Sequence, residues 1–358
     1  MRRHFGAIAL AVAISLLACA SNAPAADTDL QTKAKPTEAD VPKKAKAPPT
    51  SPVPFFYIND NRLTYAYLPD GRQTTIIGPV QKQIVAFTHY DAWAYGTNLF
   101  NVLLSKSSKN DPASPCPVFG SGCAGESFIR GTVRSTFGFN EIFDTKAFSW
   151  GILRNVSFEV GADADVTNAF VGVSTRDLVS GLQFAFSLPY NGFFNVAPLY
   201  YQEWNHISIF SPAFMPPGFT GMPDGNVHYR GTWALETNYY MDLGFLPENL
   251  QYFAISGRVG FYGPKGTGAY GPYTLPPTTK TATEMVAEPI RLTFDASKLV
   301  WGPKYSHHVD LWVSYVVLRN RTGQNDSNPA NLACFTAAGT NNGSCSAKSV
   351  YSGITVKF

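Results

Sequence analysis

Charged residues are scarce in this chain, and long apolar runs are missing beyond its N-terminal segment. Asp, Glu, Lys and Arg make up 15% of the 358 residues, against about 25% in ordinary globular domains. The mean hydropathy is nonetheless only -0.08, whereas membrane-spanning helices would raise it well above zero. The composition therefore disfavours both a water-soluble domain and a helical membrane protein.

A transmembrane β-barrel fits both shortages, because outward apolar residues alternate with inward polar residues along each strand and the average hydropathy cancels. Aromatic residues are plentiful, at 14% of the chain. The net charge of +3 is too small to indicate a nucleic-acid partner. Alternating strands are thus the pattern to look for.

Cysteine is also rare, with five residues in the chain. Cys19 lies in the N-terminal segment, and the other four form two close pairs, Cys116 with Cys123 and Cys334 with Cys345. In an oxidising compartment we expect each pair to form a local disulfide. A metal site is disfavoured because neither pair has the two-residue ligand spacing and no histidines cluster nearby. We predict no metal and no cofactor.

The N-terminal segment has the features of an export signal. Basic residues are followed by an apolar run from Phe5 to Ala18 and a small-residue end, which predicts a signal peptide over residues 1–25. "LLAC" at 16–19 leaves open a lipoprotein in which Cys19 is lipidated. Residues 26–54 are rich in Lys, Ala and Pro and predict a disordered periplasmic tether.

Beyond residue 55 the sequence contains no convincing amphipathic helix but a series of alternating segments that predict strands. Ile290 and Leu292, for example, alternate with Arg291 and Thr293, as expected for a strand with one apolar and one polar face. We predict an all-β fold, an antiparallel up-and-down barrel of about twelve strands over residues 55–358. The expected strands are 61–68, 82–90, 92–105, 127–140, 151–163, 178–189, 193–206, 226–243, 250–262, 285–296, 306–319 and 348–358.

The connections between these strands are expected to alternate in length. Five short ones are 89–92, 144–146, 189–192, 246–249 and 301–305, and six long ones are 69–81, 106–126, 164–177, 207–225, 263–284 and 320–347. Outer-membrane barrels have short periplasmic turns, longer external loops and an even number of strands. Both cysteine pairs would then lie on the external side. A secreted β-sandwich is the alternative, but its strands would be about five or six residues long and its connections would not alternate.

The order of several segments resembles the Tsx-type nucleoside-specific channels of the outer membrane. The segments are "IIGPVQKQIVAFTHYDAWAYGTNLFNV", "GTVRSTFGFNEIFDTKAFSWGILRNVSFEVGADADVTN", "VSGLQFAF" and "FNVAPLYYQEWNH". The resemblance implies a twelve-stranded barrel that passes nucleosides across the outer membrane of a Gram-negative bacterium. The tether and the cysteine-containing loops depart from the family pattern.

The expected strand registers place charges of both signs on the inward face, with tyrosine and amide groups between them. The predicted channel-lining set is Arg130, Arg134, Glu159, Arg230, Glu236, Tyr240, Arg258, Arg291 and Asp310, with Asp163 and Asn238 beside them. Such a wall suits a neutral, hydrogen-bonding solute such as a nucleoside, whose ribose can bind carboxylates and arginines and whose base can stack on tyrosine. The alternative is that these charges form ion pairs that merely fill the interior.

Outward aromatic residues, among them Trp204, Tyr229, Trp233 and Phe358, are expected to form the girdles at the membrane interfaces. The last strand, "VYSGITVKF", should pair with the first strand and close the barrel. Its terminal Phe358 resembles the signal that outer-membrane assembly machinery recognises.

The predicted function is passive, partly selective uptake of small polar solutes through the outer membrane. The alternatives are a general porin and a structural or receptor barrel that presents the disulfide-bonded loops. A lipid-modifying enzyme is less favoured, because no nucleophile and base stand at a suggestive spacing. The expected partners are outer-membrane lipid, a small polar solute and the assembly machinery.

Overall fold

A computed structural model describes most of the chain beyond residue 54. The described residues are 55–73, 76–116, 123–169, 173–207, 226–266, 269–270, 273–274, 281–329, 331, 333–336 and 338–358. The expected signal peptide and tether lie outside the described residues and stay predictions.

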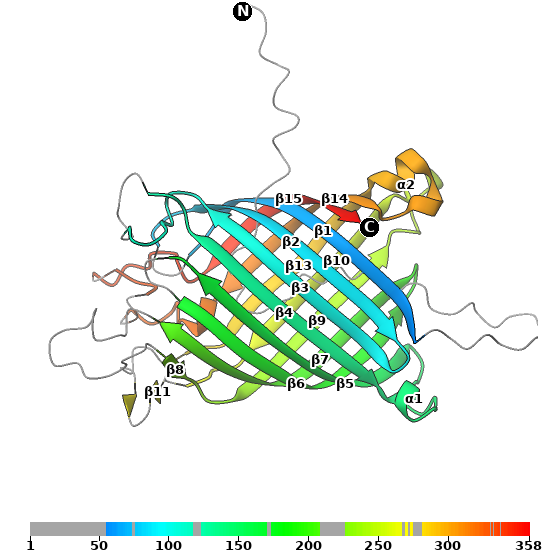
Figure 1. Cartoon of the computed structure of the whole chain (residues 1–358), viewed down its shortest axis with the longest axis horizontal. Helices are drawn as coiled ribbons and strands as arrows, with labels where there is room; N and C mark the ends of the chain where they lie inside the picture. The colour runs from blue at the N-terminus through cyan, green and yellow to red at the C-terminus, as the bar shows by residue number, and fades with distance from the viewer. Residues whose placement is uncertain are drawn as a thin grey trace, which may run out of the picture.

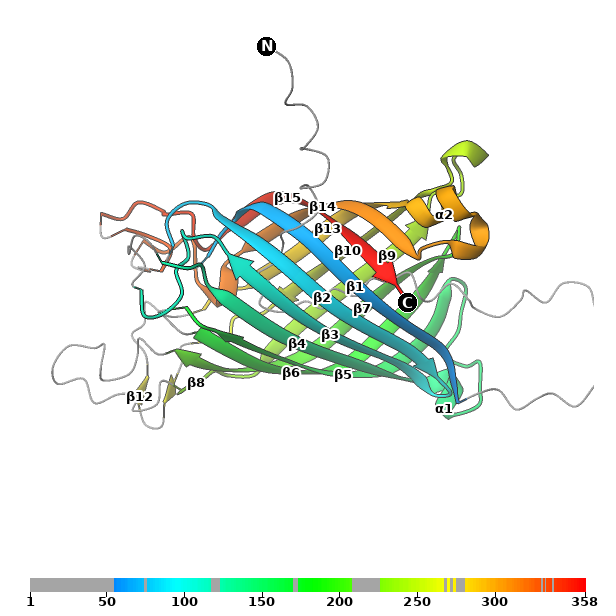
Figure 2. The same ribbon diagram turned by 45° about the horizontal axis from the view of Figure 1, so that its top comes forward.

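Twelve long antiparallel strands close into a barrel (Figures 1 and 2). They are β1 Phe56–Gly71, β2 Val80–Trp93, β3 Gly96–Ser107, β4 Ser127–Gly138, β5 Leu153–Thr167, β6 Val173–Leu188, β7 Gly192–Ile207, β9 Thr232–Asp242, β10 Phe253–Tyr262, β13 Glu284–Asp295, β14 Val309–Arg319 and β15 Ala347–Lys357. The ring closes through β1 with β15 and β7 with β9. The predicted strand order, the number of strands in the ring and the role of the last strand are confirmed.

One expected strand, 226–243, is divided in two. Its first part is β8 (Asn226–His228), which extends the edge of β7 together with β11 (Ala269–Tyr270) and β12 (Tyr273–Thr274). Between β8 and β9 the backbone N–H of Arg230 donates to the carbonyl of Lys265, outside the strand ladder. Gly231 packs so closely on Tyr200 that a Cβ there would lie 1.9 Å from the Tyr200 hydroxyl oxygen. Contacts with neighbouring segments thus override the local alternation.

The connection lengths differ from the expected strict alternation. We call the end of the barrel where β1 begins and β15 ends the turn end. It has the tight turn at 94–95 but also four short helices, α1 (Phe139–Ile142), η3 (Glu248–Leu250), α2 (Ala296–Trp301) and η5 (Pro303–Tyr305). At the opposite end, here called the loop end, the connection expected at 164–177 covers only 168–172, and η6 (Arg321–Gly323) follows β14. Strands run further than the alternation indicated because ladder hydrogen bonds continue into polar sequence. No helix in the described part of the chain is long and apolar enough to cross a membrane.

The two faces of the barrel differ in chemistry as expected. Along β13, Ile290 and Leu292 are exposed while Thr293 is buried, and the same alternation continues around the ring. The exposed apolar positions on strands include Leu63, Val85, Phe100, Leu104, Ile129, Val133, Phe158, Val160, Leu178, Leu182, Tyr200, Trp233, Leu311, Val313, Val350 and Val356. This continuous apolar outer face is the surface that a bilayer covers.

Aromatic residues gather at the turn end, whereas disulfides lie at the loop end. The exposed rings at the turn end include Phe55, Phe56, Tyr57, Tyr95, Phe143, Trp150, Tyr190, Phe245, Trp301, Tyr305 and Phe358. This arrangement is typical of an interfacial girdle. Cys116 is bonded to Cys123 and Cys334 to Cys345. Both expected disulfide pairings are present. Tyr229, expected in a girdle, is instead buried, with the ammonium of Lys265 5.0 Å from its ring centroid.

Candidate functional site: the barrel interior

Eight of the nine predicted lining residues lie on the inward face of the ring. They are Arg130, Arg134, Glu159, Glu236, Tyr240, Arg258, Arg291 and Asp310, none of which is more than 15% exposed. Arg230 is the exception, because it is exposed in the break between β8 and β9. Its placement on the wall was wrong, since the residues before β9 leave the ladder. Contact of the other eight with a solute stays a prediction.

The inward faces of β4, β5, β6 and β9 hold a group of buried charges that we call the acidic cluster. It comprises Arg130, Arg134, Glu159, Asp163, Asp165, Asp177 and Glu236. Arg130 reaches Asp163 at 3.2 Å, Asp165 at 3.7 Å and Asp177 at 3.9 Å. Five carboxylates thus surround two guanidinium groups, so the cluster carries a formal excess of negative charge.

Arg134 joins strands that are not neighbours in the ring. Its guanidinium lies 2.8 Å from Asp163 on β5 and 3.1 Å from Glu236 on β9, and β6 and β7 separate those strands. The absence of a side chain at Gly161 makes room for this crossing, because a Cβ there would lie 2.4 Å from Cδ of Arg134. The side chain of Arg134 therefore crosses the barrel interior.

A second group, here called the arginine cluster, lies on β10 and β13. Arg258 and Arg291 bind the two oxygens of Glu288 at 2.9 and 3.1 Å. The hydroxyl of Tyr351 donates to the same carboxylate, and the Arg291 guanidinium lies 4.1 Å from the ring centroid of Trp312. Two arginines share one carboxylate here, so this cluster has the opposite charge balance.

Sequence reasoning missed several buried charges, among them Lys82, Asp165, Asp177, Glu203 and Glu288. Asp177 was missed because the strand that contains it was expected to begin at 178, whereas β6 begins at Val173. Continuing the alternation of β6 by one more pair would have placed Asp177 on the inward face. Glu288 lies where the β10–β13 register shifts, between Ser256 and Arg258 on β10, so a simple two-residue period does not identify its orientation.

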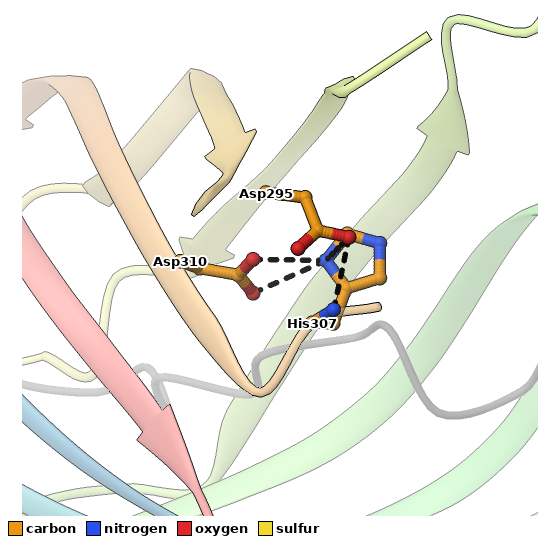
Figure 3. Close-up of side chains that lie close together, drawn as sticks. All are labelled: Asp295, His307 and Asp310. Carbon is orange, nitrogen blue, oxygen red and sulfur yellow. Dashed lines mark hydrogen bonds and ion pairs between the residues drawn. The ribbon is translucent and has the colours of Figure 1, made fainter. Parts of the chain in front are cut away.

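Two of the predicted residues, Tyr240 and Asp310, belong to a separate group at the turn end, and Figure 3 shows Asp310 there with Asp295 and His307. The His307 ring lies between Asp310, 3.0 Å from Nδ1, and the Tyr240 hydroxyl, 3.2 Å from Nε2. Asp295 accepts hydrogen bonds from the backbone N–H groups of Lys298 and His307, and so caps α2. Possible metal-ligand atoms of Asp295, His307 and Asp310 lie within 4.8 Å of one another. The hydrogen bonds among these residues and α2 explain why they lie so close, because they hold the turn that contains α2 in place.

At the loop end, a buried lysine fastens the connection between β3 and β4. Nζ of Lys82 lies 3.4 Å from both Asp111 and Glu126 and 2.9 Å from the Gln73 side-chain oxygen. Burial, with the neighbouring Glu126 carboxylate, raises the pKa of Asp111 to about 7. Burial also opposes ionisation of Glu126, but the Lys82 ammonium and hydrogen bonds hold its pKa lower, at about 2. We call Lys82, Asp111 and Glu126 the loop clamp.

A second buried lysine fastens another loop-end segment. Nζ of Lys265 is ion-paired with Glu203 on β7, and Glu203 also accepts from Tyr201 at 2.5 Å and from Asn205 at 2.7 Å. Burial alone would lower the pKa of Lys265, but the negative charges of Glu203 and Glu284 raise it overall. The segment after β10 is therefore anchored on the inner side of β7.

The inward-facing charges are almost completely withdrawn from solvent. Arg130, Glu159, Asp163 and Asp177 are each at most 4% exposed, whereas charges that line a wide aqueous channel are solvated. Eight-stranded barrels have interiors that side chains fill, and barrels of sixteen or more strands leave an aqueous channel. This twelve-stranded ring resembles the filled kind over the depth of the two clusters.

Comparisons with known proteins give only distant similarity. No protein-family model and no curated protein matches the sequence. Among solved structures, the outer membrane protein OpdK of Pseudomonas aeruginosa has a TM-score of 0.33 and 8% identity, covering 84% of this chain and 98% of that chain. A bacterial polysaccharide outer membrane secretin has a TM-score of 0.30 and 10% identity over 84% of this chain and 98% of that chain.

Likenesses at this level add nothing to the assignment, which rests on the barrel itself. A closed ring of strands satisfies its own backbone hydrogen bonds, so it can cross a bilayer without an exposed edge. The apolar outer face, the polar interior and the aromatic girdle complete the architecture of an outer-membrane protein. The chain is a transmembrane β-barrel of the outer-membrane type.

Proposed function

We propose that the protein is an outer-membrane channel for small polar solutes, with nucleosides as the substrate class. The observation that carries this proposal is the inner wall, where charges of both signs lie beside tyrosine hydroxyls. Walls of this kind select solutes by the hydrogen bonds they can replace. The nucleoside class comes from the family resemblance of the sequence and from the chemistry of the wall.

Three inward tyrosines each donate their hydroxyl to a glutamate, which supports recognition of sugar hydroxyls. Tyr262 donates to Glu236 at 3.0 Å and Tyr201 to Glu203 at 2.5 Å. The third pair is formed by Tyr351 and Glu288. A ribose hydroxyl can take the place of a tyrosine hydroxyl at such a carboxylate, and the released ring offers a face on which a base can stack.

The buried state of the wall favours a narrow, selective route over a general porin. A solute that enters must exchange its own hydrogen bonds for those between wall residues, because an unpaired buried charge is costly. Solutes without suitable donors and acceptors are thereby excluded. We expect low conductance and strong dependence on solute chemistry.

Planar-bilayer recordings with purified barrel test this proposal. Added nucleosides should block the ion current, and Tyr262→Phe should weaken the block several-fold. Tyr200→Phe is the matched control, because Tyr200 lies on β7 and is exposed on the outer face of the barrel. Equal effects of the two substitutions, or a current that no nucleoside changes, would contradict nucleoside recognition.

A structural or receptor barrel is the second candidate, favoured by the filled interior alone. Ion pairs between residues of different strands, such as Arg134 with Glu236, stiffen a barrel that need not conduct. Reconstituted protein that passes neither ions nor labelled solutes in liposomes would favour this candidate over the channel.

A further inference from the structure

Three carboxylates lie directly side by side on the inward faces of β5, β6 and β7. Asp163 pairs in register with Asp177, and Asp177 with Glu203. We call these three residues the carboxylate row. Like charges directly opposite each other on neighbouring strands destabilise a sheet, so each member needs a counter-charge or a proton.

The two outer members of the row have close partners. Asp163 accepts from the Thr132 hydroxyl at 2.5 Å and lies 2.8 Å from Arg134. Glu203 is ion-paired with Lys265 and accepts two side-chain hydrogen bonds. These interactions account for the presence of both carboxylates in the interior.

Asp177, the central member, is differently placed. It is 2% exposed, and neither of its carboxylate oxygens accepts a hydrogen bond from an N–H or O–H donor of the described residues, while the carboxyl group of Asp163 lies within hydrogen-bond reach. Its ion-pair contact there is with Arg130, 3.9 Å away, which is closer to Asp163. A buried carboxylate without hydrogen bonds is unfavourable unless a positive group joins it.

An amide oxygen next to the row has the same deficit. Asn205 lies two residues beyond Glu203 on β7 and is 3% exposed, and its Oδ1 has no donor among the described residues. Neighbouring strands thus present carboxylate and amide oxygens that only accept. The complementary ligand is a group that is positively charged or rich in donors.

We propose that Asp177, together with its neighbours in the carboxylate row and Asn205, forms a binding subsite for a monovalent cationic group. The group is either a free alkali or ammonium ion or the amino group of a permeating solute. This inference rests on the proposed channel function, to which it adds a preference for cationic over anionic solutes. Arg130, Arg134 and Lys265 flank the row, but Arg130 also pairs with Asp165 and Arg134 with Glu236, so the row can still accommodate one added positive charge.

A divalent metal fits this place less well. A divalent ion needs several oxygen ligands converging at short distance. Among the described residues, the group of three metal-ligating side chains that converge within 4.8 Å is Asp295, His307 and Asp310 at the turn end, not the carboxylate row. A monovalent cation or a single amino group needs fewer ligands and therefore fits this place better.

An equilibrium measurement on the purified full-length barrel tests binding without requiring conduction. Thermal unfolding in detergent is followed at constant ionic strength in potassium, ammonium, ethylammonium or N-methylglucamine chloride. Binding to the folded state should raise the Tm in potassium, ammonium or ethylammonium relative to the bulky N-methylglucamine ion. Asp177→Asn should remove this rise, and should itself raise the Tm in N-methylglucamine because an uncompensated carboxylate is gone.

Asp91→Asn is the matched control, since Asp91 is also on a ring strand but accepts a hydrogen bond from Asn98 at 2.8 Å. It should keep the wild-type response to cations. The competing explanation is a proton shared by Asp163 and Asp177. That explanation predicts no cation dependence, a lower Tm for Asp177→Asn and the loss of a protonated-carboxyl infrared band, and these results would overturn the subsite.

Reversal potentials under a potassium chloride gradient separate this inference from the channel proposal. The wild-type channel should prefer potassium over chloride, and Asp177→Asn should lower the permeability ratio several-fold. Conduction with the same ratio in both proteins would overturn the subsite alone. A cation-dependent Tm in a protein that never conducts would overturn the channel alone. A Tm that ethylammonium raises when potassium does not identifies a solute amine as the ligand.

Discussion

The acidic cluster and the arginine cluster contain the same two-arginine core but opposite balances of charge. Arg130 and Arg134 are surrounded by five carboxylates, whereas Arg258 and Arg291 share Glu288. In the acidic cluster the stability of the fold depends on each arginine, whereas the loss of one of the five carboxylates leaves enough of them to pair with both arginines. In the second the one carboxylate is indispensable. The cost of removing a charge should therefore depend on the cluster and not only on burial.

This difference also gives the interior a direction. Negative groups outnumber positive groups in the acidic cluster and positive groups outnumber negative groups in the arginine cluster, so a polar solute between the two clusters would meet a transverse field. A solute with separated donors and acceptors is oriented by such a field, and one without them is not. Charge changes in either cluster should alter solute preference as well as stability.

The largest loss of stability is expected for Arg134→Met. The substitution leaves Asp163 and Glu236 without their shared cation in a cluster that already has excess negative charge. Breaking a buried ion pair in this way costs about 3–5 kcal/mol. Urea unfolding of the barrel in detergent measures the loss, and Glu236→Gln in the same protein should restore part of it. A loss below about 1 kcal/mol would show that the interior is solvated.

The sharpest comparison replaces one carboxylate by its amide in each cluster. Glu288→Gln should lower the free energy of unfolding by about 2–3 kcal/mol, because two arginines and Tyr351 lose a charged acceptor. Asp165→Asn should change it by less than about 1 kcal/mol, since its backbone hydrogen bond from Thr175 can be kept. Equal losses in the two variants would remove the distinction between the clusters.

A smaller effect, dependent on pH, is expected at the loop clamp. The unfolded Asp111 ionises near pH 4, whereas its folded pKa is raised to about 7, so the folded state binds the extra proton between these values. Clamp stability should therefore fall as pH rises from about 4 to 7, by at most about 1.4 kcal/mol per pH unit for one proton. Below pH 4.5 the lowered pKa of Glu126 works in the opposite direction, and stability falls as pH falls.

Limited proteolysis of the connection between β3 and β4 across this pH range measures the clamp. Asp111→Asn should make cleavage independent of pH between 4 and 7. Lys109, which is exposed nearby, gives a control through Lys109→Gln, which should leave the pH dependence intact. Persistence of the slope in Asp111→Asn would assign it to another group.

The smallest equilibrium effect is expected at Phe358, outside both clusters. The residue is 71% exposed, and its backbone N–H donates to the carbonyl of Asn61. Deleting Phe358 should change the free energy of unfolding in detergent by about 1 kcal/mol or less. The deletion should nevertheless lower the amount of barrel assembled in cells, because we expect the assembly machinery to recognise this residue. Normal surface levels of the deleted protein would count against the assembly signal.

Much of the barrel could be derived from local sequence. Alternation such as that of Ile290, Arg291 and Leu292 specifies which side of a strand meets lipid, because neighbouring side chains of a strand must point in opposite directions. The close spacing of Cys116 and Cys123 made local pairing the simplest arrangement. The regular alternation of the final strand, which continues to Phe358, predicted that it pairs with the first strand and closes the barrel.

Departures from expectation arose where distant segments compete with that pattern. Arg230 lies off the wall because its backbone bonds to Lys265, and Tyr229 is buried under the same lysine. Asp177 was overlooked because ladder hydrogen bonds carry β6 beyond its apolar core. None of these contacts is marked by a period in the sequence.

The sequence by itself determined the class of fold, the order of the strands in the ring and the faces of most of them, since these follow from side-chain alternation within each strand. Tertiary structure alone decided which charges meet. Arg134 reaches Glu236 across the interior, and Asp163, Asp177 and Glu203 fall in one row. Closure of the ring sets these distances, and Coulomb interactions at low dielectric depend on them far more than on the residue types.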